Sequence, residues 1–101
     1  MTPEARRLAL LHQFARARHF RRQIDEGEVS TASEAAREAG LTSTRVYQLL
    51  GLLRLDPAII AAMEEPAADC RVPTEKDLYR LSQLPRLSQQ EGFRALRSNE
   101  S

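Results

Sequence analysis

Residues 31 to 54, TASEAAREAGLTSTRVYQLLGLLR, decide the fold, because they hold two short helical patterns separated by a single glycine. Ala36 is small at the point where the second helix must approach the first. Gly40 stands at the turn, where a positive φ costs little only for glycine. The stretch therefore predicts a helix-turn-helix motif over about residues 31 to 53. Its expected core consists of Ala36, Gly40, Leu41, Val46 and Leu49.

Capping residues strengthen this prediction. Thr31 and Glu34 have the spacing of a capping box at the start of the first helix of the motif. Thr42 is suited to cap the second helix, because its hydroxyl can accept a hydrogen bond from a backbone N–H group of the first turn. The two helices are therefore expected to begin just after Thr31 and Thr42.

The second helix of the motif separates a buried face from a displayed face. Apolar residues recur at i, i+3, i+4 and i+7, namely Val46, Leu49, Leu50 and Leu53. The opposite side carries Thr44, Tyr47, Gln48 and Gly51, with Ser43 and Arg45 on its flanks. Such polar side chains can hydrogen-bond to base edges in a DNA major groove, and a Tyr ring can pack on a thymine methyl group. The alternative is the solvated face of an ordinary core helix. The predicted base-reading residues are Ser43, Thr44, Arg45, Tyr47 and Gln48.

The chain at this point resembles a known family. Residues 17 to 63, ARHFRRQIDEGEVSTASEAAREAGLTSTRVYQLLGLLRLDPAIIAAM, are similar to the DNA-binding core of ParB-type and KorB-type proteins. They are still more similar to small helix-turn-helix proteins of bacterial genomes and mobile elements. The resemblance covers about residues 15 to 95 and rests on the order of features: a long basic helix, the motif, Leu-Asp-Pro, then a capped helix. It implies an all-α DNA-binding protein. No separate Arg-rich nucleotide-binding domain precedes the motif, so a CTP-driven clamp is not implied.

The residues before the motif predict one long helix. Thr2 and Pro3 are suited to open it, it runs to about Asp25, and Gly27 follows its end. Its apolar face is expected to consist of Leu10, Phe14, Ala17, Phe20 and Ile24.

The residues after the motif predict three further helices and no strand. One helix stops before Pro66, and a loop at 66 to 72 precedes the last two helices. The expected starts are Asp56 with Pro57, a capping box of Thr74 with Asp77, and a capping box of Ser88 with Glu91. We therefore expect one all-α domain of about six helices over residues 1 to 101, with a central helix-turn-helix and a frayed tail at about 98 to 101.

Composition agrees with a single small domain. The chain has 101 residues, 42% of them apolar, and two Tyr and three Phe are its only aromatic residues. That is enough for one compact core. The sequence has neither an apolar run of about 18 residues nor the long apolar segment of a signal peptide. We therefore expect a cytoplasmic protein without a membrane partner. Cys70 is the only cysteine, which excludes an internal disulfide and fits a reducing compartment.

Charge is unevenly distributed, although the net charge is only +1. Residues 1 to 24 contain six arginines and one acid, whereas residues 55 to 71 contain four acids and one arginine. The positive end can face phosphate groups, although a non-specific DNA binder is normally much more basic. The predicted contacts to the DNA backbone come from the first helix and from the helix starts of the motif: Arg16, Arg21, Arg22, Thr31, Ser33 and Thr42.

No pattern indicates an enzyme. The sequence contains no glycine-rich phosphate loop, nucleophile elbow or Ser/His/Asp order. His12 and His19 lie two turns apart without an accompanying Cys or carboxylate cluster. We therefore expect no catalytic residues, no metal and no cofactor.

Two classes of function remain. The first is a sequence-specific protein for double-stranded DNA, a transcriptional regulator or a partition or recombination accessory, that reads the major groove with the helix at about residues 43 to 53. The second is a protein–protein interaction adaptor on the same scaffold, since a fold alone does not decide function. A positive rim beside Arg45 favours DNA, and an acidic or apolar rim favours the adaptor. Tight DNA binding is expected to need a homodimer or a larger protein partner, with Phe93 and Leu96 as candidate contacts.

Overall fold

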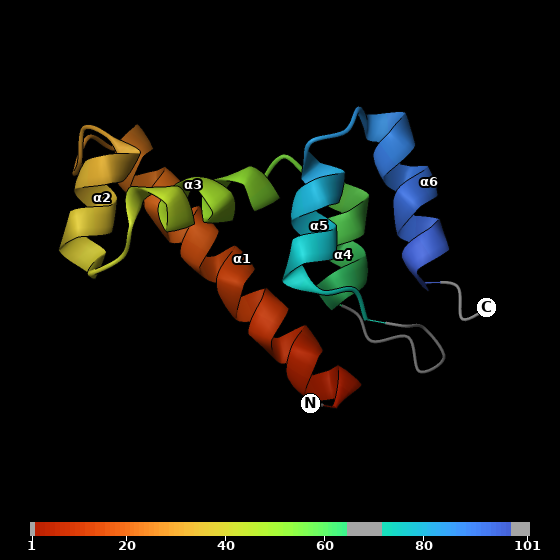
Figure 1. The fold of residues 1–101 in the computed structure, drawn as a ribbon. Coiled ribbons are helices and arrows are strands. Elements are labelled where there is room, and N and C mark those ends of the chain that lie inside the picture. The colour runs from red at the N-terminus through yellow and green to blue at the C-terminus, as the bar shows by residue number, and fades with distance from the viewer. Residues whose placement is uncertain (1, 65–71, 98–101) are drawn as a thin grey trace.

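The long first helix, α1 (Pro3–Asp25), is the element against which the next three helices pack, whereas the last two helices join the fold through the third helix and through each other (Figure 1). The computed structural model describes residues 2–64 and 72–97. Within these ranges all the regular structure is helical and there are six helices, which confirms the all-α prediction. The expected tail and residues 66–71 of the expected loop, with Cys70, lie outside the described residues. The other helices are α2 (Ala32–Ala39), α3 (Ser43–Leu52), α4 (Pro57–Glu64), α5 (Glu75–Ser82) and α6 (Arg86–Arg97).

The start and the buried face of α1 follow from its sequence. Thr2 caps the helix by accepting a hydrogen bond from the Ala5 N–H group at 3.1 Å, and Pro3 occupies the first turn, where its missing N–H is not needed. The 23 residues span roughly 34 Å, which is long enough to reach both groups of shorter helices. The predicted apolar face is confirmed, with Ile24 only half-buried and the other four residues buried: Leu10, Phe14, Ala17 and Phe20.

One group of helices, α2 and α3, packs against α1 and against each other. The buried side of α2 is made of small residues, Ala32, Ala35 and Ala36, so that its backbone can lie close to its neighbours. Val29, in the turn before α2, closes the end of this part of the core and is almost fully buried. The predicted packing role of Ala36 is therefore confirmed.

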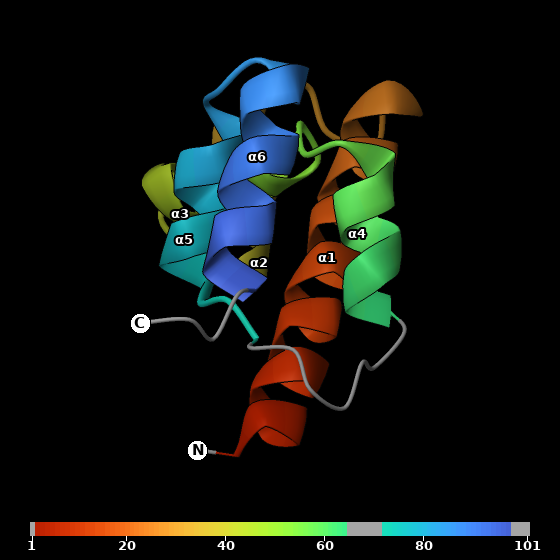
Figure 2. The same ribbon diagram turned by 90° about the vertical axis from the view of Figure 1, so that its right-hand side faces the viewer.

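The second group consists of α4, α5 and α6. Figure 2 shows α4 running beside α1, while α5 and α6 lie together on the other side. The core continues without a break from α1 and α3 into this group. Phe93 belongs to that core with only 8% of its surface exposed, so the prediction of a free dimer contact there is wrong. Leu96 is half-buried against the same core. The large apolar side chains that do face solvent near the turn into α6 are Leu84 and Leu87.

The start of α6 differs from the prediction. Ser88 was expected to cap this helix, but α6 begins at Arg86, and the Gln89 N–H group already donates to the Pro85 carbonyl at 2.9 Å. Proline has a fixed φ near the helical value and no N–H group, so Pro85 favours an earlier start. The capping box of Thr74 with Asp77 at the start of α5 is confirmed in full.

Gln89 is a buried polar residue that joins the two halves of the fold. Its side-chain Oε1 accepts from the Asp56 N–H group at 2.7 Å. Its Nε2 donates to the Leu84 carbonyl at 2.9 Å and to the Arg54 carbonyl at 3.2 Å. One side chain of α6 thus fixes the segment between α3 and α4 and the turn between α5 and α6.

Candidate nucleic-acid interface

The turn between α2 and α3 has the geometry that the sequence predicts. Gly40 adopts the left-handed conformation with φ 73° and ψ 27°. Its N–H group donates to the Arg37 carbonyl, and the Leu41 N–H group donates to the Ala36 carbonyl at 2.9 Å. This pair of hydrogen bonds is the Schellman arrangement, which ends a helix and lets the chain leave at a sharp angle. Leu41 is half-buried against the core, as expected for the plug after the turn.

Both predicted caps of the motif are present. Thr31 accepts from the Glu34 N–H group, and Thr42 accepts from the Arg45 N–H group, each at 3.1 Å. The second half of the first box is shifted by one residue, because the Glu34 carboxylate accepts from Ser30 and not from Thr31. A threonine hydroxyl that accepts one bond still has its own hydrogen to donate. Thr31 and Thr42 are both exposed, so each can still donate to a phosphate oxygen.

The exposed side of α3 carries most of the residues that the sequence assigns to it. Val46 and Leu49 have no exposed surface, whereas Tyr47 is 58% exposed and Thr44 is also exposed. Ser43 and Gln48 are half-buried at the two edges of this surface. An aromatic ring exposed to this extent in the middle of a helix, beside hydroxyl and amide groups, can pack on a base or reach a phosphate.

Gly51 is not displayed, and the sequence interpretation is wrong at this position. A Cβ atom added to Gly51 would lie 2.9 Å from Cε1 of Tyr79, because α5 packs over the carboxyl-terminal end of α3. Leu52 is also buried, while Leu50 and Leu53 of the predicted stripe are only half-buried. The accessible part of α3 is therefore restricted to its first two turns.

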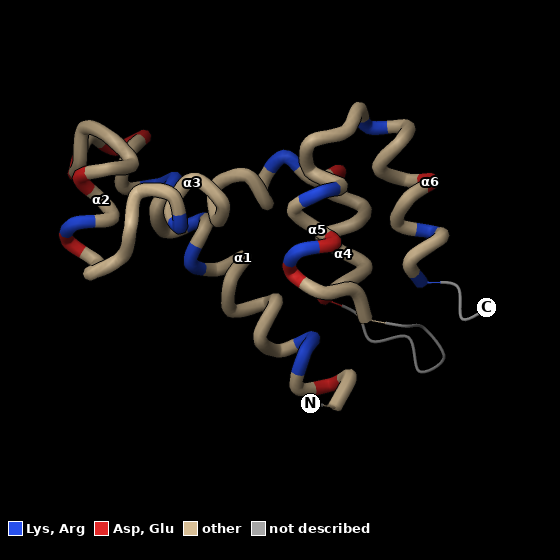
Figure 3. The backbone as a smooth tube through the Cα atoms, in the orientation of Figure 1, with Lys and Arg blue, Asp and Glu red and all other residues tan. Residues whose placement is uncertain are grey.

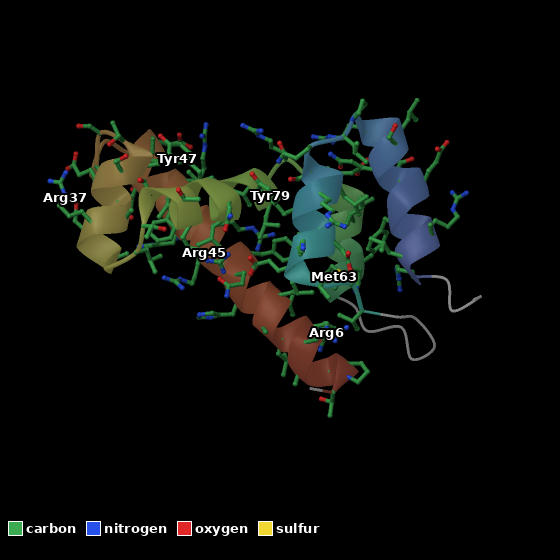
Figure 4. All side chains as sticks on the ribbon, viewed as in Figure 1. Arg6, Arg37, Arg45, Tyr47, Met63 and Tyr79 are labelled. Carbon is green, nitrogen blue, oxygen red and sulfur yellow. The ribbon has the colours of Figure 1, made fainter. Side chains whose placement is uncertain are left out.

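Arg45 is not free on the flank of α3. Its guanidinium Nη1 and Nη2 atoms donate to the two carboxylate oxygens of Glu75 at the start of α5, the second bond being 3.0 Å long. This hydrogen bonding raises the pKa of Arg45 above its ordinary value. Figure 4 shows Arg45 and Tyr47 on opposite sides of α3. The positive charge that the sequence places beside the predicted base-reading residues is thus paired with an acid.

A hollow of about 470 Å³ adjoins Tyr47 and has an arginine on each of two different segments. Arg21 comes from α1, where it also pairs with Asp25 at 3.3 Å, and Arg54 comes from the turn after α3. Arg54 was not among the predicted contacts, although Tyr47, Gly51 and Arg54 follow the i, i+4, i+7 spacing of one helical side. Two cations beside an exposed Tyr suit a phosphate group.

The other predicted backbone contacts do not gather at that hollow. Arg16 lies with its guanidinium 5.9 Å from the Phe20 ring centroid and lines a second hollow, between α1 and α2, together with His19 and Glu38. Arg21 follows Arg16 by five positions, which turns the two side chains about 140° apart on the helix. Arg22 and Ser33 are exposed. Figure 3 shows positive and negative positions interspersed along the described helices.

Other features of the described residues are sparse. No group of three or more His, Cys, Asp or Glu side chains that could hold a metal ion is found among residues 2–64 and 72–97. In the same part of the chain no single helix is long and apolar enough to cross a membrane. The pair α3 and α4 reaches the required composition only when taken together, with a bend of 92° between them.

Comparison with known proteins adds no relative. A scan against protein-family models, a search of curated proteins and a search of solved structures each found no match for this chain.

Proposed function

We propose that this protein binds double-stranded DNA in a sequence-specific way, with the first two turns of α3 in the major groove. The observation that carries the proposal is the exposed Tyr47, which stands beside Thr44 and Gln48 and next to a hollow with Arg21 and Arg54. Base edges would be read by the polar side chains of α3, whereas the arginines would hold phosphate groups. The left-handed turn at Gly40 and the capped start of α3 support the helix-turn-helix interpretation.

The role that fits this proposal is that of a transcriptional regulator or a partition or recombination accessory. It rests on the similarity of residues 17 to 63 to the ParB-type and KorB-type DNA-binding core. The reading surface is short, because α5 covers Gly51 and Glu75 engages Arg45. A short surface reads few base pairs, so tight binding would need two half-sites and a homodimer, or a larger protein partner.

The test is selection of binding sites from a random DNA pool, followed by titration of the selected and random duplexes. We expect a preferred site and a clear loss of affinity as salt is raised, since neutralised phosphates release counterions. Gln48→Ala should weaken binding to the preferred site by about 1 to 3 kcal/mol and leave binding to random DNA nearly unchanged. Tyr47→Ala should likewise relax the sequence preference.

Arg54→Ala should behave differently. It should weaken binding to all sequences alike and reduce the salt slope by about one unit, because a phosphate contact carries no sequence information. Arg94→Ala is the matched control, since Arg94 is an exposed arginine of α6, on the far side of α5 from α3 (Figure 1). If Arg54→Ala and Arg94→Ala weaken DNA binding equally, the assignment of Arg54 to the DNA-binding surface is wrong.

One observation favours the second candidate, a protein-interaction adaptor. Leu87 is 77% exposed and Leu84 is 44% exposed near the turn into α6, and exposed leucines close together in the sequence are the kind of feature that a protein partner can cover. If the selected pool shows no enrichment and Tyr47 and Gln48 variants behave like the wild type, the adaptor becomes the better account.

A further inference from the structure

The contact between Arg45 and Glu75 links the proposed reading helix to the second group of helices. Arg45 is the third residue of α3, and Glu75 is the first residue of α5. The guanidinium engages both carboxylate oxygens, so the pair is bidentate. The side chain of Arg45 is 29% exposed and that of Glu75 is 32% exposed, so the pair is partly shielded from water but still accessible.

Gln48 links this pair to one edge of the proposed DNA surface, although Arg45 itself lies on the side of α3 opposite Tyr47 (Figure 4). Gln48 lies three residues after Arg45, and residues with this spacing are neighbours on the surface of a helix. Thr74 and Asp77 form their own capping box, so Glu75 is not needed to cap α5. The charge of Glu75 is therefore available to Arg45, and its loss need not unfold the helix that carries it.

A phosphate group can take the place of this carboxylate. Both groups present two oxygens to the planar fork of a guanidinium, and arginine binds each of them with paired hydrogen bonds. We propose that Glu75 keeps the Arg45 guanidinium paired while the protein is free of DNA, and that a DNA phosphate displaces the carboxylate when α3 enters the groove. The inference rests on the proposed function, because it names a regulator of the same surface. Glu75 is a positioning residue here: it acts on DNA through Arg45.

If a DNA phosphate replaces the Glu75 carboxylate on Arg45, then Glu75→Gln should raise the DNA affinity more than the removal of another negative charge does. Glu75→Gln frees Arg45 before DNA arrives, so affinity for the preferred duplex should rise about 3- to 10-fold near 0.1 M salt, while the salt slope should change little because Arg45 contacts the same phosphate in both proteins. Arg45→Ala should lower the affinity. In the Arg45→Ala background, Glu75→Gln should give only the smaller gain expected from removing a negative charge.

Glu38→Gln measures the gain in DNA affinity that comes from removing one negative charge alone. Glu38 is an exposed acid of α2 that forms no ion pair within the described residues, so its loss changes the net charge equally without releasing an arginine. Circular dichroism melts of every variant establish that the fold is retained. A gain from Glu75→Gln that is no larger than the gain from Glu38→Gln, or equal in both Arg45 backgrounds, overturns the inference.

A measurement on the wild type complements the variants. The guanidinium resonances of Arg45, assigned by their loss in Arg45→Lys, should shift when the preferred duplex is added, and those of Arg94 should stay in place. Unchanged Arg45 resonances at saturating DNA would show that Glu75 keeps its partner, which refutes the exchange while leaving DNA binding intact. If the wild type binds no duplex at all, the proposed function fails first and the exchange fails with it.

Discussion

The buried side chain of Gln89 offers the most direct test of how the two halves of this fold are joined. Gln89→Leu keeps nearly the same volume but removes the side-chain oxygen and nitrogen. The Asp56 N–H group loses its acceptor, and the Arg54 and Leu84 carbonyls lose their donor. Because Gln89 is only 2% exposed, water cannot easily replace these bonds.

The expected cost follows from those three hydrogen bonds. A buried bond contributes about 1 kcal/mol to stability, and an orphaned buried group costs about 1 to 3 kcal/mol, so Gln89→Leu should lower the free energy of unfolding by about 3 kcal/mol. For a domain of this size that corresponds to a fall of roughly 12 to 24 °C in Tm. Urea denaturation and thermal melts followed by circular dichroism at 222 nm measure both quantities.

Gln90→Leu is the matched control. Gln90 is the next residue, is exposed, and donates one bond at 2.9 Å to the Asp56 carboxylate, so its loss should cost less than about 1 kcal/mol. Amide hydrogen exchange should also become faster at Asp56 in Gln89→Leu and not in Gln90→Leu. Equal free energies of unfolding for the two variants would contradict the assigned role of Gln89. So would a free energy of unfolding for Gln89→Leu within about 0.5 kcal/mol of the wild-type value.

Three further predictions concern single positions. Gly40→Val should destabilise the domain by more than about 1 kcal/mol, because φ is 73° there; Gly40→Asn should cost less, and equal melting temperatures for the two would contradict the conformational explanation. Gly51→Leu should destabilise the domain by about 2 kcal/mol through its clash with Tyr79, whereas a displayed glycine would gain about 1 kcal/mol from better helix propensity, so the sign of the change decides. Hydrogen bonds from the Ala58 N–H group and from Gln90 lower the pKa of Asp56 below its ordinary value of 3.8, so its charge stabilises the fold above that pH and the stabilisation is lost as the pH falls through the lowered pKa. The stability advantage of the wild type over Asp56→Asn should therefore be full at pH 6 and shrink below pH 4, and an advantage that grows toward low pH would contradict this assignment.

The proposed function depends on how little of α3 is accessible. The proposed reading surface has one aromatic ring and a few hydroxyl and amide groups, and Arg54, which lines the hollow beside Tyr47, forms no ion pair within the described residues. Since the chain carries a net charge of only +1, general attraction to DNA should be weak. Specific contacts from α3, a second copy of the chain, or the release of Arg45 would have to supply the rest of the affinity.

The sequence by itself determined the local geometry of the chain. The caps at Thr31, Thr42 and Thr74 and the left-handed turn at Gly40 each depend on residues at most five positions apart. Such short-range hydrogen bonds depend on residue types and spacing within one segment, although the same spacing at Ser88 and Glu91 does not produce a cap because α6 begins earlier. The same holds for the apolar face of α1, because the side of a long helix with regularly spaced apolar residues is buried in almost any compact fold.

Only the tertiary structure decided that α5, a helix of the second group, covers part of α3. The periodicity of α3 indicates which side faces α1 and α2, but it cannot indicate that a later helix covers the other side as well. Tyr79 buries Gly51 in this way, and Glu75, 30 residues from Arg45 along the chain, pairs with its guanidinium. Both contacts are set by how α5 docks, and docking depends on the shape of the whole core, which no local pattern contains.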